Sequence, residues 1–125
     1  MKSVVTFLFS FFISLSAFAQ SSHHDTSWKI VPTETVCMVT EAHFSKPQIP
    51  VVVSGKTYYG CCEGCKKTLT EDKTAREAVD PVTKKTVDKA TATIAANSSG
   101  KVLYFENKKN FEKYMSLHSS HHSNH

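Results

Sequence analysis

Short runs of β-branched and aromatic residues alternate along the chain with stretches in which apolar residues recur at helical spacing. The first succession has an apolar run at 49–53, the turn dipeptide Ser54-Gly55 and an aromatic run at 56–59. Such runs, bounded by turn residues, are typical of strands, and glycine suits a hairpin turn that needs a positive φ. The pattern therefore predicts a β-hairpin over this stretch, followed by a helix that includes Leu69.

The same order of elements recurs later in the chain. Runs at 90–95 and 101–105 flank a turn that ends at Gly100, and a helical pattern follows at 106–114. A repeated order of this kind reveals the unit of architecture, but one ββα unit is too small to bury a useful core alone. We therefore expect an α+β fold of two small ββα units, packed together as a degenerate tandem repeat.

Two further stretches carry helical signals. Phe111, Tyr114 and Met115 recur at i, i+3 and i+4, which predicts an apolar face on the last helix. Asn107 is the expected N-cap of that helix. The stretch 74–79 is expected to form a short helical turn, because a proline follows it closely.

Residues 1–19 have the pattern of a signal peptide. Lys2 precedes an apolar run at 4–15, and Ala17-Phe18-Ala19 fits the small-x-small cleavage rule. The run is shorter than the roughly 20 residues that span a bilayer. We therefore expect a chain that is exported to the periplasm or secreted, with no membrane span after cleavage. An uncleaved N-terminal anchor is the alternative.

The net charge of the chain is only mildly positive. The full chain has a formal net charge of +4, and its lysines are scattered among acidic residues, so we expect no nucleic-acid binding. Both ends of the expected mature chain are polar and rich in histidine. The segments 20–33 and 117–125 are therefore expected to be flexible. Histidine tracts are a weak signal for binding of Zn, Cu or Ni, and a plain polar tail is the alternative. The terminal histidines are His23, His24, His118, His121, His122 and His125.

Four cysteines carry the strongest chemical signal. Three lie in the run Cys61-Cys62-Glu63-Gly64-Cys65, and the fourth is Cys37. Cys61 and Cys65 share one face at the start of a helix, whereas Cys62 and Cys65 form a Cys-x-x-Cys pair, as in metal knuckles and redox motifs. Because Cys61 and Cys62 are adjacent, we do not expect both to bind one ion. Cys37 can fold back as a third ligand.

The surroundings of the cysteines favour a thiophilic metal. The helix start and the neighbouring Lys66 and Lys67 are expected to lower the pKa of the thiols, and soft thiolates select Cu(I) or Zn(II). Cys62, Met38 and His43 are less certain additional ligands. The alternative for Met38 is a place in the core, and the alternative for His43 is a place in a surface loop.

The second half has no thiolate site. Glu106 and Asn110 stand where the first half has Cys61 and Cys65. We expect these two residues to be solvated at the helix start, in a half that gives structural support.

The succession of Cys37, the hairpin around Gly55 and Cys61-x-x-x-Cys65 resembles the TRASH and YHS-like domains. These are small treble-clef-like modules associated with trafficking, resistance and sensing of heavy metals. The second half resembles a YHS unit without its cysteines. The resemblance implies a metal-binding unit at 34–75 and a structural unit at 76–116. It also implies the ligand set Cys37, Cys61 and Cys65.

Three functions follow from these patterns. The first is an exported, non-enzymatic protein that buffers, delivers or senses Cu(I) or Zn(II), with a metal efflux or trafficking protein as partner. The second is a thiol-redox protein that uses Cys62 and Cys65, although no thioredoxin-like βαβ order is present. The third is a structural module held by a disulfide such as Cys37–Cys65, since export compartments oxidise thiols.

Overall fold

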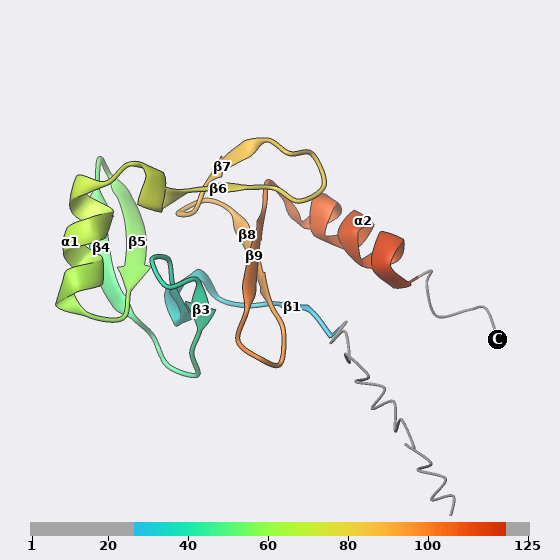
Figure 1. The fold of residues 1–125 in the computed structure, drawn as a ribbon, viewed down its shortest axis with the longest axis horizontal. Coiled ribbons are helices and arrows are strands. Elements are labelled where there is room, and N and C mark those ends of the chain that lie inside the picture. The colour runs from blue at the N-terminus through green and yellow to red at the C-terminus, as the bar shows by residue number, and fades with distance from the viewer. Residues whose placement is uncertain (1–26, 120–125) are drawn as a thin grey trace, which may run out of the picture.

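The computed structural model describes residues 27–119, which form a mixed α+β fold with two helices and four small sheets (Figure 1). The predicted signal peptide and five of the six terminal histidines lie outside the described residues. Within this range, neither helix has the length and apolar character needed to cross a membrane.

The first predicted hairpin and helix are confirmed. Strand β4 (Ile49–Val53) pairs antiparallel with β5 (Lys56–Gly60), and α1 (Glu63–Glu71) follows. The two turn residues Ser54 and Gly55 have φ values of 51° and 77°. Positive φ at both central positions matches the right-handed twist of the strands, so this short turn fixes the register of the hairpin.

The second hairpin and its helix are also confirmed. Strand β8 (Thr93–Ala96) pairs with β9 (Val102–Phe105), and β1 (Lys29–Ile30) adds a third strand beside β8. Helix α2 (Lys108–Ser119) follows, and the side chain of Asn107 accepts a hydrogen bond of 2.9 Å from a backbone N–H in its first turn. Strand β1 lies in the segment 20–33 and the end of α2 lies in the segment 117–125. We predicted both segments to be flexible, and this was wrong for the parts that form these elements.

Helix α2 packs on the sheet through aromatic rings. The ring centroids of Phe111 and Tyr114 lie 5.6 and 5.5 Å from that of Phe105, and Trp28 meets Tyr114 edge-on at 6.4 Å. Edge-to-face pairs at such distances are favourable beyond the area they bury. The apolar face predicted for this helix is therefore used in packing.

Short elements connect the two hairpins. The prediction of a helical turn at 74–79 was wrong for its second half, because residues 77–79 pair antiparallel with a neighbouring strand. The connecting elements are η1 (Thr33–Thr35), β2 (Val36–Cys37), β3 (Ala42–His43), η2 (Thr74–Arg76), β6 (Glu77–Val79) and β7 (Thr86–Asp88).

One hydrophobic core is shared by both halves of the chain. Its members come from segments between β2 and β9, in both halves of the chain. Neither hairpin therefore has a core of its own. This agrees with the expectation that one ββα unit buries too little surface to be stable alone. The cluster consists of Val36, Met38, Val51, Tyr58, Leu69, Val87, Ala92, Ile94, Ala96, Val102 and Tyr104.

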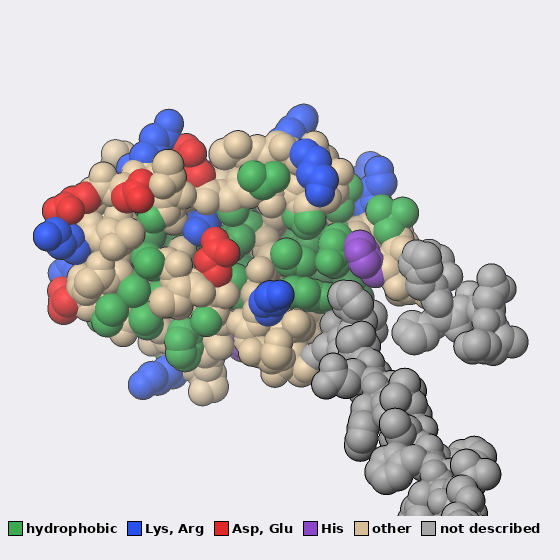
Figure 2. Space-filling model, viewed as in Figure 1, with side chains coloured by type: hydrophobic (Ala, Val, Ile, Leu, Met, Phe, Trp, Pro, Cys, Tyr) green, Lys and Arg blue, Asp and Glu red, His purple; other side chains and the backbone are tan. Residues whose placement is uncertain are grey.

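Polar contacts also join the halves. The ammonium of Lys56 lies 2.6 Å from a carboxylate oxygen of Asp88, and the Tyr58 hydroxyl donates to the same oxygen at 3.1 Å. On the face shown in Figure 2, basic and acidic side chains alternate around α1. The mixed signs on this face match the charge scatter along the sequence.

Candidate metal centre

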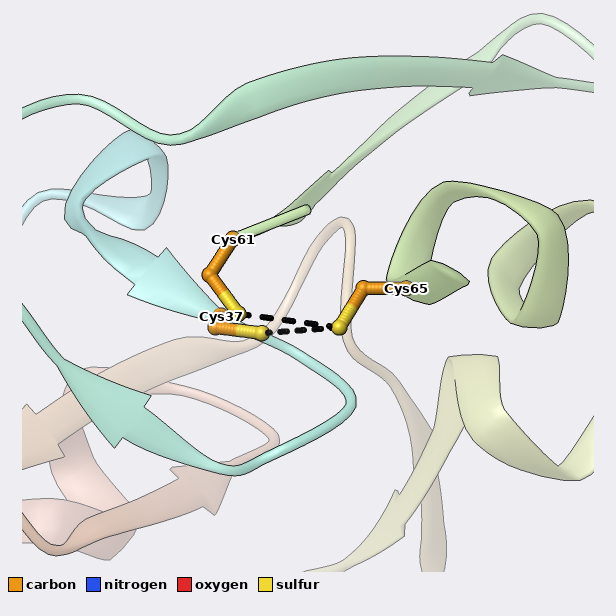
Figure 3. Close-up of side chains that lie close together, drawn as sticks. All are labelled: Cys37, Cys61 and Cys65. Atoms are coloured by element: carbon orange, nitrogen blue, oxygen red, sulfur yellow. Dashed lines mark hydrogen bonds between the residues drawn. The ribbon is translucent and has the colours of Figure 1, made fainter. Parts of the chain in front are cut away.

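Three cysteine sulfurs from separate elements meet at one point. Cys37 ends β2, Cys61 directly follows β5, and Cys65 lies in the first turn of α1. Their Sγ atoms all lie within 4.8 Å of one another. The Sγ of Cys65 is 3.8 Å from that of Cys37 and 3.6 Å from that of Cys61 (Figure 3).

These spacings suit a thiolate-bound ion. Zinc–sulfur bonds are about 2.3 Å long, so a tetrahedral ion holds its sulfur ligands about 3.8 Å apart. The sulfurs of Cys37, Cys61 and Cys65 already lie near that separation. The donor set is purely soft, which favours Cu(I) or Zn(II) over hard cations.

Backbone hydrogen bonds bring Cys37 to the other two cysteines. Strand β2 pairs with β3, so that Cys37 faces Ala42 across the ladder. The next residue, Met38, donates its N–H to the carbonyl of Tyr59 at 2.9 Å. Because Tyr59 lies two residues before Cys61, this bond aligns the Cys37 segment with the end of β5.

Gly60 allows α1 to begin close to β5. A Cβ atom at this position would lie 2.9 Å from the Cβ of Cys65 and 3.5 Å from a methyl carbon of Leu69. The first distance is shorter than any ordinary carbon–carbon contact, so a larger residue would push the helix start away. Sequence reasoning missed this role, although a glycine directly before a cysteine pair is a signal of close approach.

The site is buried on one side and open on the other. Cys37 is 0% exposed and Cys65 is 6% exposed. Cys61 and Cys62 are exposed. All four cysteines are free thiols in the structure. A bound ion would therefore be shielded by the core on the side of Cys37 and Cys65 and accessible from the side of Cys61.

The surroundings of Cys37 favour its thiolate. Burial raises the pKa of this thiol, but hydrogen bonds from the side chain and backbone of Thr40 and from the backbone of Val39 outweigh burial and lower the pKa to about 7. Cys37 therefore forms a thiolate more readily than an ordinary cysteine.

The pKa values of the other three thiols shift in different directions. Burial, with contacts to the neighbouring thiols, raises the pKa of Cys65 to about 12. A hydrogen bond to a neighbouring thiol raises the pKa of Cys61, whereas the backbone of Cys65 lowers the pKa of Cys62. The expectation that the helix start, Lys66 and Lys67 would lower these pKa values was therefore wrong for Cys61 and Cys65. Burial is the main cause at Cys65, and the hydrogen bond with Cys37 is the main cause at Cys61.

Cys62 lies beside the group of three. Its Sγ is 3.4 Å from that of Cys65, yet it is not among the sulfurs that all lie within 4.8 Å of one another. It is the N-cap residue of α1. Cys62 therefore contacts Cys65 and lies outside the set of three mutually close sulfurs.

Core packing determines the position of Met38, and strand pairing determines that of His43. Met38 is fully buried in the hydrophobic core, so its thioether fills space there. His43 is half-buried in β3, opposite Val36, and does not belong to the cysteine group found among the described residues.

Lys89 holds the segment that follows Cys37 and was missed by sequence reasoning. It is 3% exposed, and its ammonium donates to the Met38 carbonyl at 2.8 Å and pairs with Glu41 at 2.9 Å. The same ammonium lies 5.2 Å from the ring centroid of Tyr104. A lysine is seldom buried unless its charge is paired, so these contacts explain its position.

In the second half, a buried carboxylate lies at the start of the helix. Asp80 is 0% exposed, and one of its oxygens accepts hydrogen bonds of 2.8 Å from the Glu106 N–H and from the Asn110 side chain. The expectation that Asn110 is merely solvated was wrong, because its amide reaches this buried carboxylate. Burial raises the pKa of Asp80, but these bonds outweigh burial and hold the pKa below its ordinary value.

Comparisons of the chain with protein-family models, with curated proteins and with solved structures find no match. A function must therefore be inferred from the geometry and chemistry of the cysteine group.

Proposed function

We propose that this protein is an exported metal-binding protein, not an enzyme, that buffers, delivers or senses a thiophilic heavy metal. The metal is Cu(I) or Zn(II), and its ligands are Cys37, Cys61 and Cys65. One observation carries the proposal: three sulfurs from separate elements converge within 4.8 Å of one another.

The chemistry of the three thiols supports a metal ligand set. Cys37, with a pKa of about 7, needs little help to form a thiolate, whereas Cys65, with a pKa of about 12, keeps its proton in the metal-free protein. A thiophilic cation displaces such a proton when it binds, so that metal affinity rises with pH. The buried pair fixes the ion, and the exposed Cys61 completes the site.

The open side suits exchange of the ion with a partner. An ion held by three thiolates accepts a further ligand from solvent or from another protein, because a tetrahedral site has a fourth position. We infer that a metal efflux or trafficking protein supplies that ligand at the exposed Cys61. The predicted signal peptide puts this exchange in the periplasm or outside the cell.

The proposal includes membership of the TRASH and YHS-like group, with a treble-clef-like unit at 34–75 and a cysteine-free unit at 76–116. Two features support a tandem repeat. A hairpin followed by a helix occurs in each half. In addition, Asp80 bonds to Glu106 and Asn110, the positions that align with two of the cysteines. Hydrogen bonds there link a loop to a helix start, as an ion would in the first half.

A metal titration with thiol substitutions tests the proposal. The purified protein is reduced, kept anaerobic and titrated with Cu(I) and separately with Zn(II) in competition with a chelator. We expect one ion per chain, bound more tightly than micromolar, and loss of this site in Cys61→Ser and in Cys65→Ser. Cys62→Ser is the matched control and keeps the site.

Binding of neither ion below a micromolar dissociation constant would overturn the proposal. Equal damage from Cys62→Ser and Cys65→Ser would contradict the ligand set.

A further inference from the structure

We propose that Cys62 and Cys65 form a thiol–disulfide exchange site whose substrate is a disulfide, and that its oxidation withdraws Cys65 from the metal centre. The first part concerns the metal-free protein and stands alone, whereas the second part rests on the proposed function.

The sulfur geometry selects this pair. The Sγ atoms of Cys62 and Cys65 are 3.4 Å apart, closer than Cys65 is to Cys61 or to Cys37. The two residues have the Cys-x-x-Cys spacing of redox motifs and belong to one short segment at the start of α1, so a local adjustment can bring their Cβ atoms to the roughly 3.5–4.5 Å of a disulfide. No movement of a distant element is needed, unlike a bond between Cys65 and Cys37.

Cys62 and Cys65 differ in exposure, which gives them different roles in the exchange. Cys62 is exposed at the N-cap of α1, and its side chain makes no capping hydrogen bond. Cys65 is buried beneath it, with 6% exposure. A Cβ added at Gly64 would have Cys62 Sγ, at 3.8 Å, as its nearest neighbour, so the approach to Cys62 is open. A disulfide from solvent can therefore reach Cys62 but not Cys65.

The reaction is a balanced exchange. The Cys62 thiolate attacks one sulfur of a disulfide RS–SR, the S–S bond breaks, and RS⁻ leaves as a mixed disulfide forms on Cys62. The released RS⁻ takes the proton of Cys65 and becomes RSH, and the sulfur of Cys65 attacks Cys62 Sγ. The Cys62–Cys65 bond forms and the second RS⁻ leaves. Two electrons pass from the cysteine pair to the disulfide, which is reduced to two thiols.

Oxidation affects the metal centre because Cys65 belongs to both groups of cysteines. Cys65 has the three other sulfurs within 3.8 Å, so it belongs both to this pair and to the metal group. A sulfur in a disulfide is no longer a thiolate ligand, and only Cys37 and Cys61 remain for the ion. Oxidation by a disulfide therefore releases the metal, and a dithiol reductant restores the site.

Disulfide mapping of the metal-free protein tests the exchange site. The reduced full chain is exposed to oxidised glutathione, quenched with acid and mapped by mass spectrometry. We expect Cys62–Cys65 as the main intramolecular bond, with Cys37 and Cys61 free, and a trapped glutathione adduct on Cys62 in Cys65→Ser. Cys62→Ser keeps a good N-cap residue, and its oxidation is slowed roughly tenfold or more.

A main bond between Cys65 and either Cys37 or Cys61 overturns the exchange site. So does unchanged oxidation of Cys62→Ser, because Cys62 would then not be the entry point.

Zinc release tests the coupling. The zinc-loaded protein is treated with oxidised glutathione beside a chromogenic chelator, and we expect zinc release at the rate at which the Cys62–Cys65 bond forms. Cys62→Ser is expected to bind zinc but to release it roughly tenfold more slowly. Zinc retained after the bond has formed overturns the coupling. A chain that binds neither ion overturns the proposed function, while the mapping of the metal-free protein still decides the exchange site.

Discussion

Two buried tyrosines differ in one hydrogen bond. The hydroxyl of Tyr58 donates to Asp88 at 3.1 Å, whereas the buried hydroxyl of Tyr104 has no hydrogen-bond partner within residues 27–119. Burial raises the pKa of both. An unpaired buried hydroxyl costs free energy, so the hydroxyl of Tyr104 lowers the stability of the fold.

Substituting each tyrosine by phenylalanine separates these cases. We expect Tyr58→Phe to lower the free energy of unfolding by about 1 kcal/mol and Tyr104→Phe to leave it unchanged or raise it. Urea denaturation followed by circular dichroism measures both. An equal loss in the two variants would show that the Tyr104 hydroxyl has a partner.

Gly60 and Gly64 form a second matched pair. A Cβ at position 60 would lie 2.9 Å from the Cβ of Cys65, but at position 64 it would meet nothing closer than 3.8 Å. We expect Gly60→Ala to destabilise the fold by about 1–3 kcal/mol through overpacking and to weaken metal binding by moving Cys65. Gly64→Ala, inside α1, is expected to be neutral or stabilising. Urea denaturation and metal titration of both variants check this, and equal effects would contradict it.

At the scale of elements, the hairpins and helices followed from local patterns. Ser54-Gly55 and Gly100 mark turns with positive φ, and the flanking runs are rich in β-branched and aromatic residues. Strands of two or three residues, such as β2 and β3, carry too few positions to show a period. Their position beside β5 depends on the hydrogen bond from the Met38 N–H to the Tyr59 carbonyl, a contact between segments distant in the sequence, which no local pattern contains.

The candidate site was predictable to the same extent. Spacing alone predicted that Cys61 and Cys65 share one helix face, and this was wrong for Cys61, which precedes the N-cap residue Cys62. The approach of Cys37 needs the hydrogen bond between Met38 and Tyr59. The roles of Lys89 and Asp80 were missed because their partners lie far away along the chain.

Asp80 links the β6–β7 loop to the start of α2, and this link is sensitive to acid. The pKa of Asp80 is held below its ordinary value. A carboxylate with a lowered folded pKa stabilises the protein fully above its unfolded pKa, about 3.9, and this stabilisation is lost as pH falls through the lower folded value. The native chain is therefore expected to lose stability steeply below about pH 4.

Asp80→Ala tests this link. We expect a loss of about 1–3 kcal/mol at neutral pH, because buried N–H groups lose their acceptor, and a flatter dependence of stability on pH below about 4. Thermal unfolding between neutral and acidic pH is the measurement. Glu112→Gln, in an exposed pair with Lys108, is the control and is expected to change little. A pH profile identical to that of the native chain would refute the assignment.

At the scale of the whole molecule, one core and a few polar contacts make the two halves a single folding unit. The core residues come from both halves, and Lys89 reaches from the second half to the Met38 carbonyl. The metal group in the first half is therefore supported by residues of the second.

Lys89→Met probes this support. We expect a loss of about 1–3 kcal/mol, since the Met38 carbonyl loses its donor, and weaker metal binding through the loosened Cys37 segment. Lys73→Met, in an exposed pair with Glu77, is the control and is expected to cost less than about 1 kcal/mol. Urea unfolding with and without zinc measures both effects. Unchanged metal affinity in Lys89→Met would show that the second half does not support the metal site.

The ligand set is tested most directly by alkylation footprinting. The reduced protein is treated with iodoacetamide in the absence and in the presence of one equivalent of Zn(II), and each cysteine is quantified by peptide mass spectrometry. Metal binding by three thiolates predicts slower alkylation of Cys37, Cys61 and Cys65 with zinc, while Cys62 reacts as in the metal-free chain. Unprotected Cys61, or Cys62 protected as strongly as Cys61, would contradict the three-cysteine centre.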